Sequence, residues 1–152
     1  MQIRVANRQD EPIIRTIVGL TKAELGQSEL DLTGGDADLA NIESYYFWND
    51  GLFIVAEDDG TIVGLCGARR GESESTLELV RLIVVPARRK TGVAAELLNV
   101  VEFFAGNAEY PQIVFDAKNP RVGQESPFAG FAEAPERPGQ WLRPVKASTR
   151  VC

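Results

Sequence analysis

The turn Arg88-Arg89-Lys90 concentrates positive charge between an apolar run, Leu79 to Val85, and Gly92, where a helix can begin. Backbone N–H groups at a helix N-terminus lack partners within the helix and carry the positive end of its dipole, so they bind anions. A glycine at such a turn lets the ligand approach the backbone closely. These residue types and their spacing predict a phosphate-binding turn.

Two well-known phosphate motifs are excluded at this turn. In a Walker A loop the Lys-Thr pair follows a glycine, whereas Lys90-Thr91 precedes Gly92, and the glycine pattern of dinucleotide-binding folds is missing. A solvated loop that binds nothing is the alternative. The concentration of basic residues nevertheless stands out in a chain whose net charge is −6.

The catalytic groups available to the chain are limited. It contains no histidine, which excludes Ser-His triads and zinc sites with histidine ligands. Cys66 lies inside an apolar run and Cys152 is the last residue, so we expect neither a disulfide framework nor a Cys-x-x-Cys site. Proton transfer must use other groups, and we expect no metal.

Hydrophobic periodicity and turn residues indicate the elements that position this turn. We expect strands at 3–6, 52–56, 61–66, 77–85, 113–115 and 141–145, and helices at 11–26, 37–47, 92–105 and, weakly, 122–129. The run 77–85 should be a central strand that is buried on both faces. The order predicts a mixed α+β fold, and 152 residues fit one domain, 1–152.

Composition narrows the class of partner. The chain is 44% hydrophobic and 25% charged, as in soluble globular proteins. A net charge of −6 argues against binding nucleic acid and would suit a cationic small molecule better. We see no signal peptide and no apolar stretch long enough to span a membrane, so we expect a cytoplasmic protein without membrane contact.

The segment Arg89-x-x-Gly92-x-Ala94 resembles the acyl-CoA pyrophosphate loop of the GNAT acetyltransferases, commonly Gln/Arg-x-x-Gly-x-Gly/Ala. The preceding Val84-x-Pro86-x-x-Arg89 and the following Leu97-Leu98 also match, and the likeness covers about Gly51 to Phe131. Residues 1–50 fit only by the order of their elements. The resemblance implies the GNAT acyl-CoA N-acyltransferase fold, a mostly antiparallel sheet flanked by helices with strands that splay near Val84 and Val85.

The resemblance also implies acetyl-CoA as the acyl donor and a set of residues that hold it. Backbone groups at the end of the central strand would pair with the pantetheine arm, and the loop would hold the diphosphate. Asn119 matches an asparagine that follows the next strand in the family. The residues implied for the donor are Ile83, Val84, Val85, Arg88, Arg89, Lys90, Thr91, Gly92, Val93, Ala94 and Asn119.

The catalytic residues that the resemblance implies are Glu78 and the position of Ser126. Glu78 matches a glutamate used as general base in some members, and burial of its carboxylate would favour proton uptake. A glutamate in a surface salt bridge is the alternative. Ser126 occupies the place of the usual acid, a tyrosine, and its high pKa makes it a poor substitute. Unless Tyr45, Tyr46 or Tyr110 reaches the sulfur, we expect the acid to be water or absent.

The implied reaction is direct attack by an amine, of a small molecule or a peptide, on the acetyl thioester, whose oxygen is polarised by the N–H of Val84 or Val85. Residues 45–48 could line the acceptor pocket, with Asp31, Asp36, Asp38 and Glu43 attracting a cation. The alternatives are a noncatalytic acyl-CoA-binding or regulatory domain, and a structural domain that binds nothing. Homodimers are common in the family.

Overall fold

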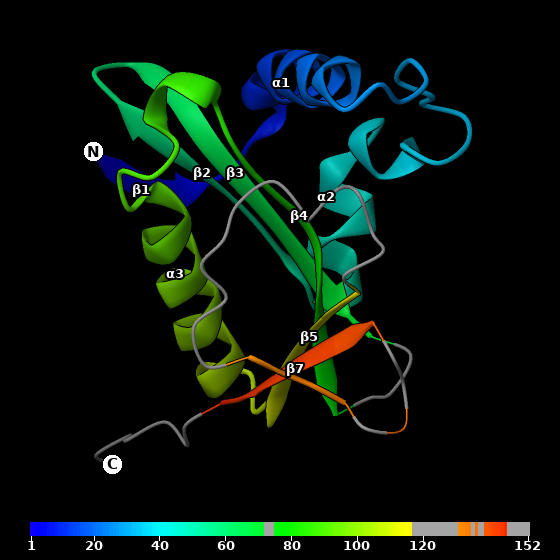
Figure 1. Ribbon diagram of the computed structural model, residues 1–152, viewed down its shortest axis with the longest axis vertical. Coiled ribbons are helices and arrows are strands. Elements are labelled where there is room, and N and C mark those ends of the chain that lie inside the picture. The colour runs from blue at the N-terminus through cyan, green and yellow to red at the C-terminus, as the bar shows by residue number, and fades with distance from the viewer. Residues whose placement is uncertain (72–74, 117–130, 135, 137–138, 146–152) are drawn as a thin grey trace.

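The computed structural model describes residues 1–71, 75–116, 131–134, 136 and 139–145. Its strands form a seven-stranded sheet within these residues, in the order β1-β2-β3-β4-β5-β7-β6 (Figure 1). All neighbouring strands are antiparallel except β4 and β5. The strands are β1 (Gln2–Val5), β2 (Leu52–Asp58), β3 (Thr61–Arg70), β4 (Thr76–Val84), β5 (Gln112–Asp116), β6 (Ala132–Glu133) and β7 (Gln140–Pro144).

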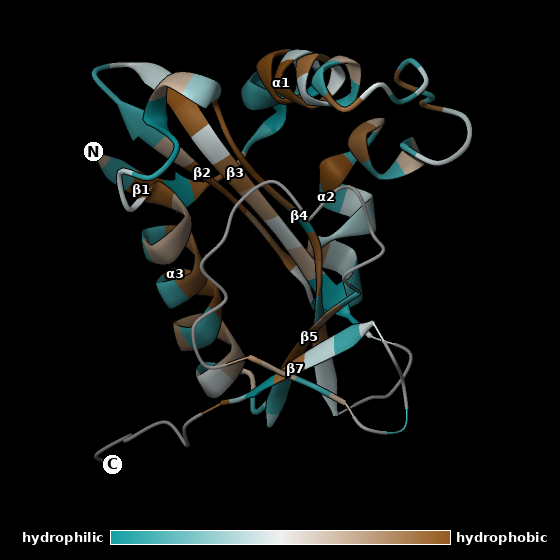
Figure 2. Ribbon diagram, in the orientation of Figure 1, coloured by the Kyte–Doolittle hydropathy of each residue, from teal (hydrophilic) through white to brown (hydrophobic). Residues whose placement is uncertain are grey.

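The sheet is covered by helices on both faces. Helix α3 (Val93–Asn107) packs on one face, and α1 (Glu11–Glu24) and α2 (Ile42–Tyr45) lie over the other (Figure 1). Each face buries an apolar cluster, and apolar residues dominate β2, β3 and β4 in Figure 2. The predicted mixed fold, with a mostly antiparallel sheet flanked by helices, is confirmed.

Most strands and both long helices form where the sequence predicts them. Pro12 lies in the first turn of α1, and Gly26, at φ +69°, follows its end. The β2–β3 hairpin turns at Asp59 and Gly60, which both have positive φ. Helix α3 continues to Asn107, just past the expected stop at Gly106. The weak helix 122–129 lies outside the described residues.

The prediction of one helix over 37–47 is wrong. This stretch forms a 3-10 turn (Ala37–Leu39), the short α2, and a second 3-10 turn, Phe47–Asn49. Asn41 is extended, at φ −153°, and its side chain accepts a hydrogen bond from the Ser44 N–H, which starts α2 anew. Leu39, Ile42 and Tyr46 are nevertheless all buried, so their helical spacing imitated a continuous helix.

The sheet is split between β4 and β5. The two strands pair at Thr76↔Gln112, Leu77↔Ile113 and Glu78↔Val114, and beyond these positions they diverge (Figure 1). A β-bulge in the β3–β4 ladder, where Val80 has no partner between Gly67↔Arg81 and Ala68↔Leu79, bends β4 at this point. The strands therefore part just after Glu78, earlier than the predicted Val84-Val85 region.

Candidate functional site

The far half of β4 exposes backbone groups to the split. The Val85 N–H donates to the Val63 carbonyl at 2.9 Å, so Val85 is bonded to β3. Because such pairs alternate along an antiparallel ladder, Ile83 also bonds to β3, whereas Val84 and Leu82 direct their N–H and C=O groups away from it. Of the three residues predicted to pair with pantetheine, Val84 directs its N–H into the split, and its carbonyl accepts a hydrogen bond from Arg89. Leu82 was missed, although strand alternation could have indicated it.

The basic turn lies at the N-terminus of α3, next to the end of β4. Lys90 and Gly92 have positive φ, +64° and +93°, which turns the chain into the helix. Gly92 is the N-cap and, having no side chain, makes no capping hydrogen bond to the first N–H groups of α3. A Cβ on Gly92 would meet no atom within 4 Å, so the space beside this helix end is open. The predicted loop residues are thus brought together around an open helix N-terminus.

The three cations of the turn differ in their partners. Arg89 donates from Nη1 and Nη2 to both Glu24 carboxylate oxygens, at 2.8 and 2.7 Å, and from Nε to the Val84 carbonyl at 3.0 Å. Arg88 forms an ion pair with Asp58. These hydrogen bonds lower the pKa of Glu24 and of Asp58. Lys90 is exposed and has no ion-pair partner among the described residues, so its charge is free for a ligand.

Glu78 lies at the point where the sheet splits. It is the last β4 residue paired with β5, and its side chain is 26% exposed. Its Oε1 is 3.7 Å from Nη2 of Arg69, on the neighbouring strand β3. The carboxylate is therefore partly buried beside a cation, which is the salt-bridged arrangement left open by the sequence. Its catalytic role stays a prediction.

Two of the tyrosines considered as the general acid are bound elsewhere. Tyr46 is fully buried and donates its hydroxyl to Asp38 at 2.6 Å, and burial together with this carboxylate raises its pKa well above the usual value. The Tyr110 hydroxyl donates to the Asp50 carbonyl at 3.0 Å. Tyr45 lies beneath Arg69, with the guanidinium 5.6 Å from its ring centre. Asn119 and Ser126 lie outside the described residues.

Of the four acidic residues expected to attract a cation, three are paired with cations of the chain itself, and Asp31 accepts a hydrogen bond from a neutral side chain. Asp36 and Asp38 are buried and bind Arg81, through Nη2 at 3.0 Å and Nε at 2.7 Å respectively. Lys22 contacts Asp36 at 2.6 Å. Glu43 pairs with Arg8 at 3.3 Å, and Asp31 accepts hydrogen bonds from Thr33. Arg81 was not predicted as the partner of these carboxylates, although a lone arginine within an apolar strand is a signal of a buried ion pair.

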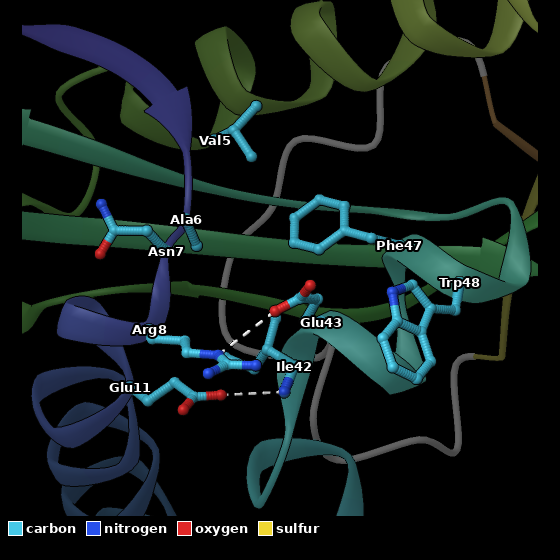
Figure 3. A pocket seen from close by; sticks show the side chains of 9 residues that line it. All are labelled: Val5, Ala6, Asn7, Arg8, Glu11, Ile42, Glu43, Phe47 and Trp48. Carbon is cyan, nitrogen blue, oxygen red and sulfur yellow. Dashed lines mark hydrogen bonds and ion pairs between the residues drawn. The ribbon is translucent and has the colours of Figure 1, made fainter.

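Three of the four aromatic residues 45–48 line pockets, and Tyr46 is buried. Phe47 and Trp48 face a pocket of about 420 Å³ beside Val5 and Ala6, where β1 leads into α1 (Figure 3). Its strand residue, Val5, belongs to β1, and β2 and β3 lie between β1 and β4 in the sheet. A second pocket, of about 330 Å³, is lined by Tyr45, Trp48, Asn49, Asp50, Arg69, Arg70 and Gly71. Through Arg69 this second pocket reaches Glu78.

A split sheet and a glycine-containing basic turn at the start of α3 are the two features that the resemblance to the GNAT acetyltransferases predicts. The family model described as the acetyltransferase (GNAT) family matches residues 23–122, and the chain belongs to this family. The predicted family is thereby confirmed.

Curated relatives and solved structures agree with this assignment. The chain is 40% identical over 78 residues to human N-acetylaspartate synthetase, a match that covers 51% of this chain and 26% of that protein. It is 33% identical over 99 residues to rat N-acetyltransferase family 8 member 2, covering 62% of this chain and 44% of that protein. The matched segments are thus less than half of either relative.

Two solved structures show the same fold over nearly the whole chain. A GNAT acetyltransferase from Staphylococcus aureus Mu50 superposes with a TM-score of 0.78 at 20% identity, covering 95% of this chain and 99% of that one. A GNAT acetyltransferase from Brucella melitensis, in complex with acetyl-CoA, gives a TM-score of 0.67 at 19% identity, covering 95% and 88%.

Proposed function

We propose that this chain is a GNAT-type N-acetyltransferase that moves an acetyl group from acetyl-CoA to an amine acceptor. The observation that carries the proposal is the uncapped N-terminus of α3, with Gly92 and the free cation Lys90, next to the open backbone edge of β4. Membership of the GNAT family supports it, as does the acetyl-CoA bound to the Brucella melitensis neighbour.

Three parts of the donor have a partner in this proposal: the diphosphate, the pantetheine arm and the thioester. The first N–H groups of α3 and the Lys90 ammonium bind the diphosphate, since a helix N-terminus and a cation both stabilise anions. The backbone groups of Leu82 and Val84 extend the sheet toward the pantetheine amides. The thioester would then lie in the split near Glu78, where a backbone N–H can polarise its oxygen.

Glu78 is the residue we propose as general base. The attacking amine must lose a proton as its nitrogen bonds to the thioester carbon, and a carboxylate directly or through one water can accept it. The carbon–sulfur bond then breaks, and the thiolate takes a proton from water or from an acid. Ser126 holds the family's acid position by sequence, and its role stays a prediction.

A noncatalytic acyl-CoA-binding domain is the second candidate. It is favoured by the serine at position 126 and by the structural hydrogen bonds of Tyr46 and Tyr110, which occupy both hydroxyls. This candidate shares the donor site with the first and differs in turnover. Release of free thiol in the presence of amines therefore separates the two.

Titration calorimetry with acetyl-CoA tests the donor site. Lys90→Glu should weaken binding about 10- to 100-fold, because it replaces a charge-assisted contact with a repulsive one. Arg8→Glu is the matched control: Arg8 is an exposed cation at the β1–α1 junction, and its reversal should leave binding unchanged. Absence of binding by folded wild-type protein would overturn the proposal. An equal loss in both variants would contradict the position of the site.

Three further predictions from the sequence concern location, domain organisation and assembly. They are a cytoplasmic location, a single domain over residues 1–152 and a homodimer, and all three stay predictions. No helix in the described residues is long and apolar enough to cross a membrane.

The acceptor is an amine of a small molecule or a peptide. The name of the human relative, N-acetylaspartate synthetase, fits an amino-acid acceptor.

A further inference from the structure

Arg69 is a cation with unused hydrogen-bonding capacity beside the proposed base. Its Nε is buried and has no hydrogen-bond partner among the described residues. Its Nη2 lies 3.7 Å from Glu78, beyond the usual hydrogen-bond range of about 2.7–3.2 Å. The side chain is 38% exposed and borders the 330 Å³ pocket. A buried donor without a partner requires an explanation, and a shift of the partly exposed guanidinium onto a ligand in this pocket would supply one.

The charged residues near Arg69 leave part of its hydrogen-bonding capacity unused. Asp50, in the same pocket, is 2.6 Å from Arg70 and is therefore engaged by another arginine. Tyr45 supports the guanidinium from one side through its ring. This aromatic contact fixes the orientation of the guanidinium while leaving its donors available. Arginine is well suited to bind a planar carboxylate in this way.

We propose that the acceptor carries a carboxylate next to its amine, as a free amino acid does, and that Arg69 binds this carboxylate. This inference rests on the proposed acetyl transfer and names its substrate class. The Arg69 guanidinium and the Glu78 carboxylate are both partly exposed and lie 3.7 Å apart. Each can therefore leave the other and bind a group of the ligand instead. An amino acid offers both complementary groups across one carbon, its amine to Glu78 and its carboxylate to Arg69.

The carboxylate takes no part in bond making. The amine nitrogen forms a bond to the acetyl carbon, the carbon–sulfur bond breaks, one amine proton passes to Glu78, and the thiolate takes a proton from solvent. Arg69 holds the carboxylate throughout, so it orients the amine toward the thioester. It is a specificity-determining residue, and its removal should act mainly on the binding of acceptors that carry a carboxylate.

The test compares the twenty protein amino acids with their α-amides as acceptors, with acetyl-CoA as donor and release of free thiol as the readout. Wild type should acetylate at least one amino acid about 10- to 100-fold more efficiently than its amide. Arg69→Gln should remove this preference, chiefly by raising KM for the amino acid, and leave the rate with the amide nearly unchanged. Arg69→Lys should restore part of the preference. Arg8→Gln, at an exposed arginine outside this pocket, is the control.

The outcomes separate this inference from the proposed function. Equal efficiency with acids and amides would overturn the carboxylate site, and so would an equal loss for both in Arg69→Gln. Acetyl-CoA binding without turnover of any amino acid would also overturn it, and would leave peptides or other amines as acceptors. Failure of folded wild type to bind acetyl-CoA would instead overturn the proposed function.

Discussion

Glu78 has a fixed place at the opening of the sheet and a partly exposed carboxylate. The strand ladder with β3 and β5 fixes its backbone, and the Arg69 guanidinium restrains its side chain from one side. A proton acceptor in this place can reach an amine that enters from the α2 face. The position of the residue thus supports its proposed role more than burial does.

Replacing Glu78 with glutamine tests this role. We expect kcat to fall about 10²- to 10⁴-fold, because the amide cannot accept the amine proton, while the Kd for acetyl-CoA stays unchanged. Glu29→Gln, at an exposed loop residue, is the matched control and should behave like wild type. An unchanged kcat in Glu78→Gln would remove Glu78 from the mechanism.

The donor residues were more predictable from the sequence than the acceptor residues. Gly92 and its basic neighbours form one continuous segment, so their spacing alone indicated an anion site. Arg69 and Glu78 meet only because β3 and β4 pair, and Asp36 reaches Arg81 across 45 positions. A pattern along the chain does not show which distant charges will become partners. The same limit explains why Asp36 and Asp38 were expected to be free.

At the level of elements, a buried charge network connects the α1–α2 segment to β4. Arg81 is fully buried, and its guanidinium donates hydrogen bonds to both Asp36 and Asp38. The Tyr46 hydroxyl also donates a hydrogen bond to Asp38. Burial opposes the charge of Arg81, but the bonds to Asp38 and Asp36 outweigh it and raise its pKa. The network fixes one wall of the acceptor side to the strand that carries Glu78.

Removing one member of this network should be costly. We expect Arg81→Leu to lower the free energy of unfolding by about 3–5 kcal/mol, because two buried carboxylates lose their cation. Arg70→Leu, which breaks the exposed pair with Asp50, should lower it by about 1 kcal/mol or less. Urea unfolding of both variants measures the difference. Similar small losses would show that the Lys22 ammonium on Asp36 and the Tyr46 hydroxyl on Asp38 suffice to stabilise the two carboxylates.

The broken helix at 37–47 shows what hydrophobic periodicity can and cannot predict. Leu39, Ile42 and Tyr46 have helical spacing and are all buried, so the pattern of a packed face is present without a continuous helix. The interruption at Asn41 depends on one side chain capping a new helix, and asparagine also occurs within helices. Spacing therefore indicates which residues pack but not the backbone that presents them.

For the whole molecule, the network makes stability depend on pH. Burial disfavours the Asp36 carboxylate, but the Asp31 N–H, Lys22 and Arg81 outweigh burial and lower its pKa to about 2. The unfolded chain, in which this pKa is 3.8, takes up the proton first as pH falls. The contribution is therefore complete above about pH 5 and lost between about pH 4 and 2.

Unfolding measured by denaturant across this range checks the sign. We expect the Asp36 contribution, about 2 kcal/mol, to disappear as the pH is lowered from 5 to about 2. Asp36→Asn should be less stable at pH 7 and should lose correspondingly less on acidification. If wild type and variant fall in parallel, Asp36 does not supply this dependence.

Only three residue pairs join β4 to β5 in the described part of the sheet. From Glu78 to Val84, β4 extends about 20 Å beyond the last pair, at about 3.3 Å per residue. Over this length, a difference of about 5° in the angle between the two strands corresponds to a difference of about 2 Å in the width of the opening. The pairing at Glu78 therefore sets how wide the sheet opens at the far end of β4.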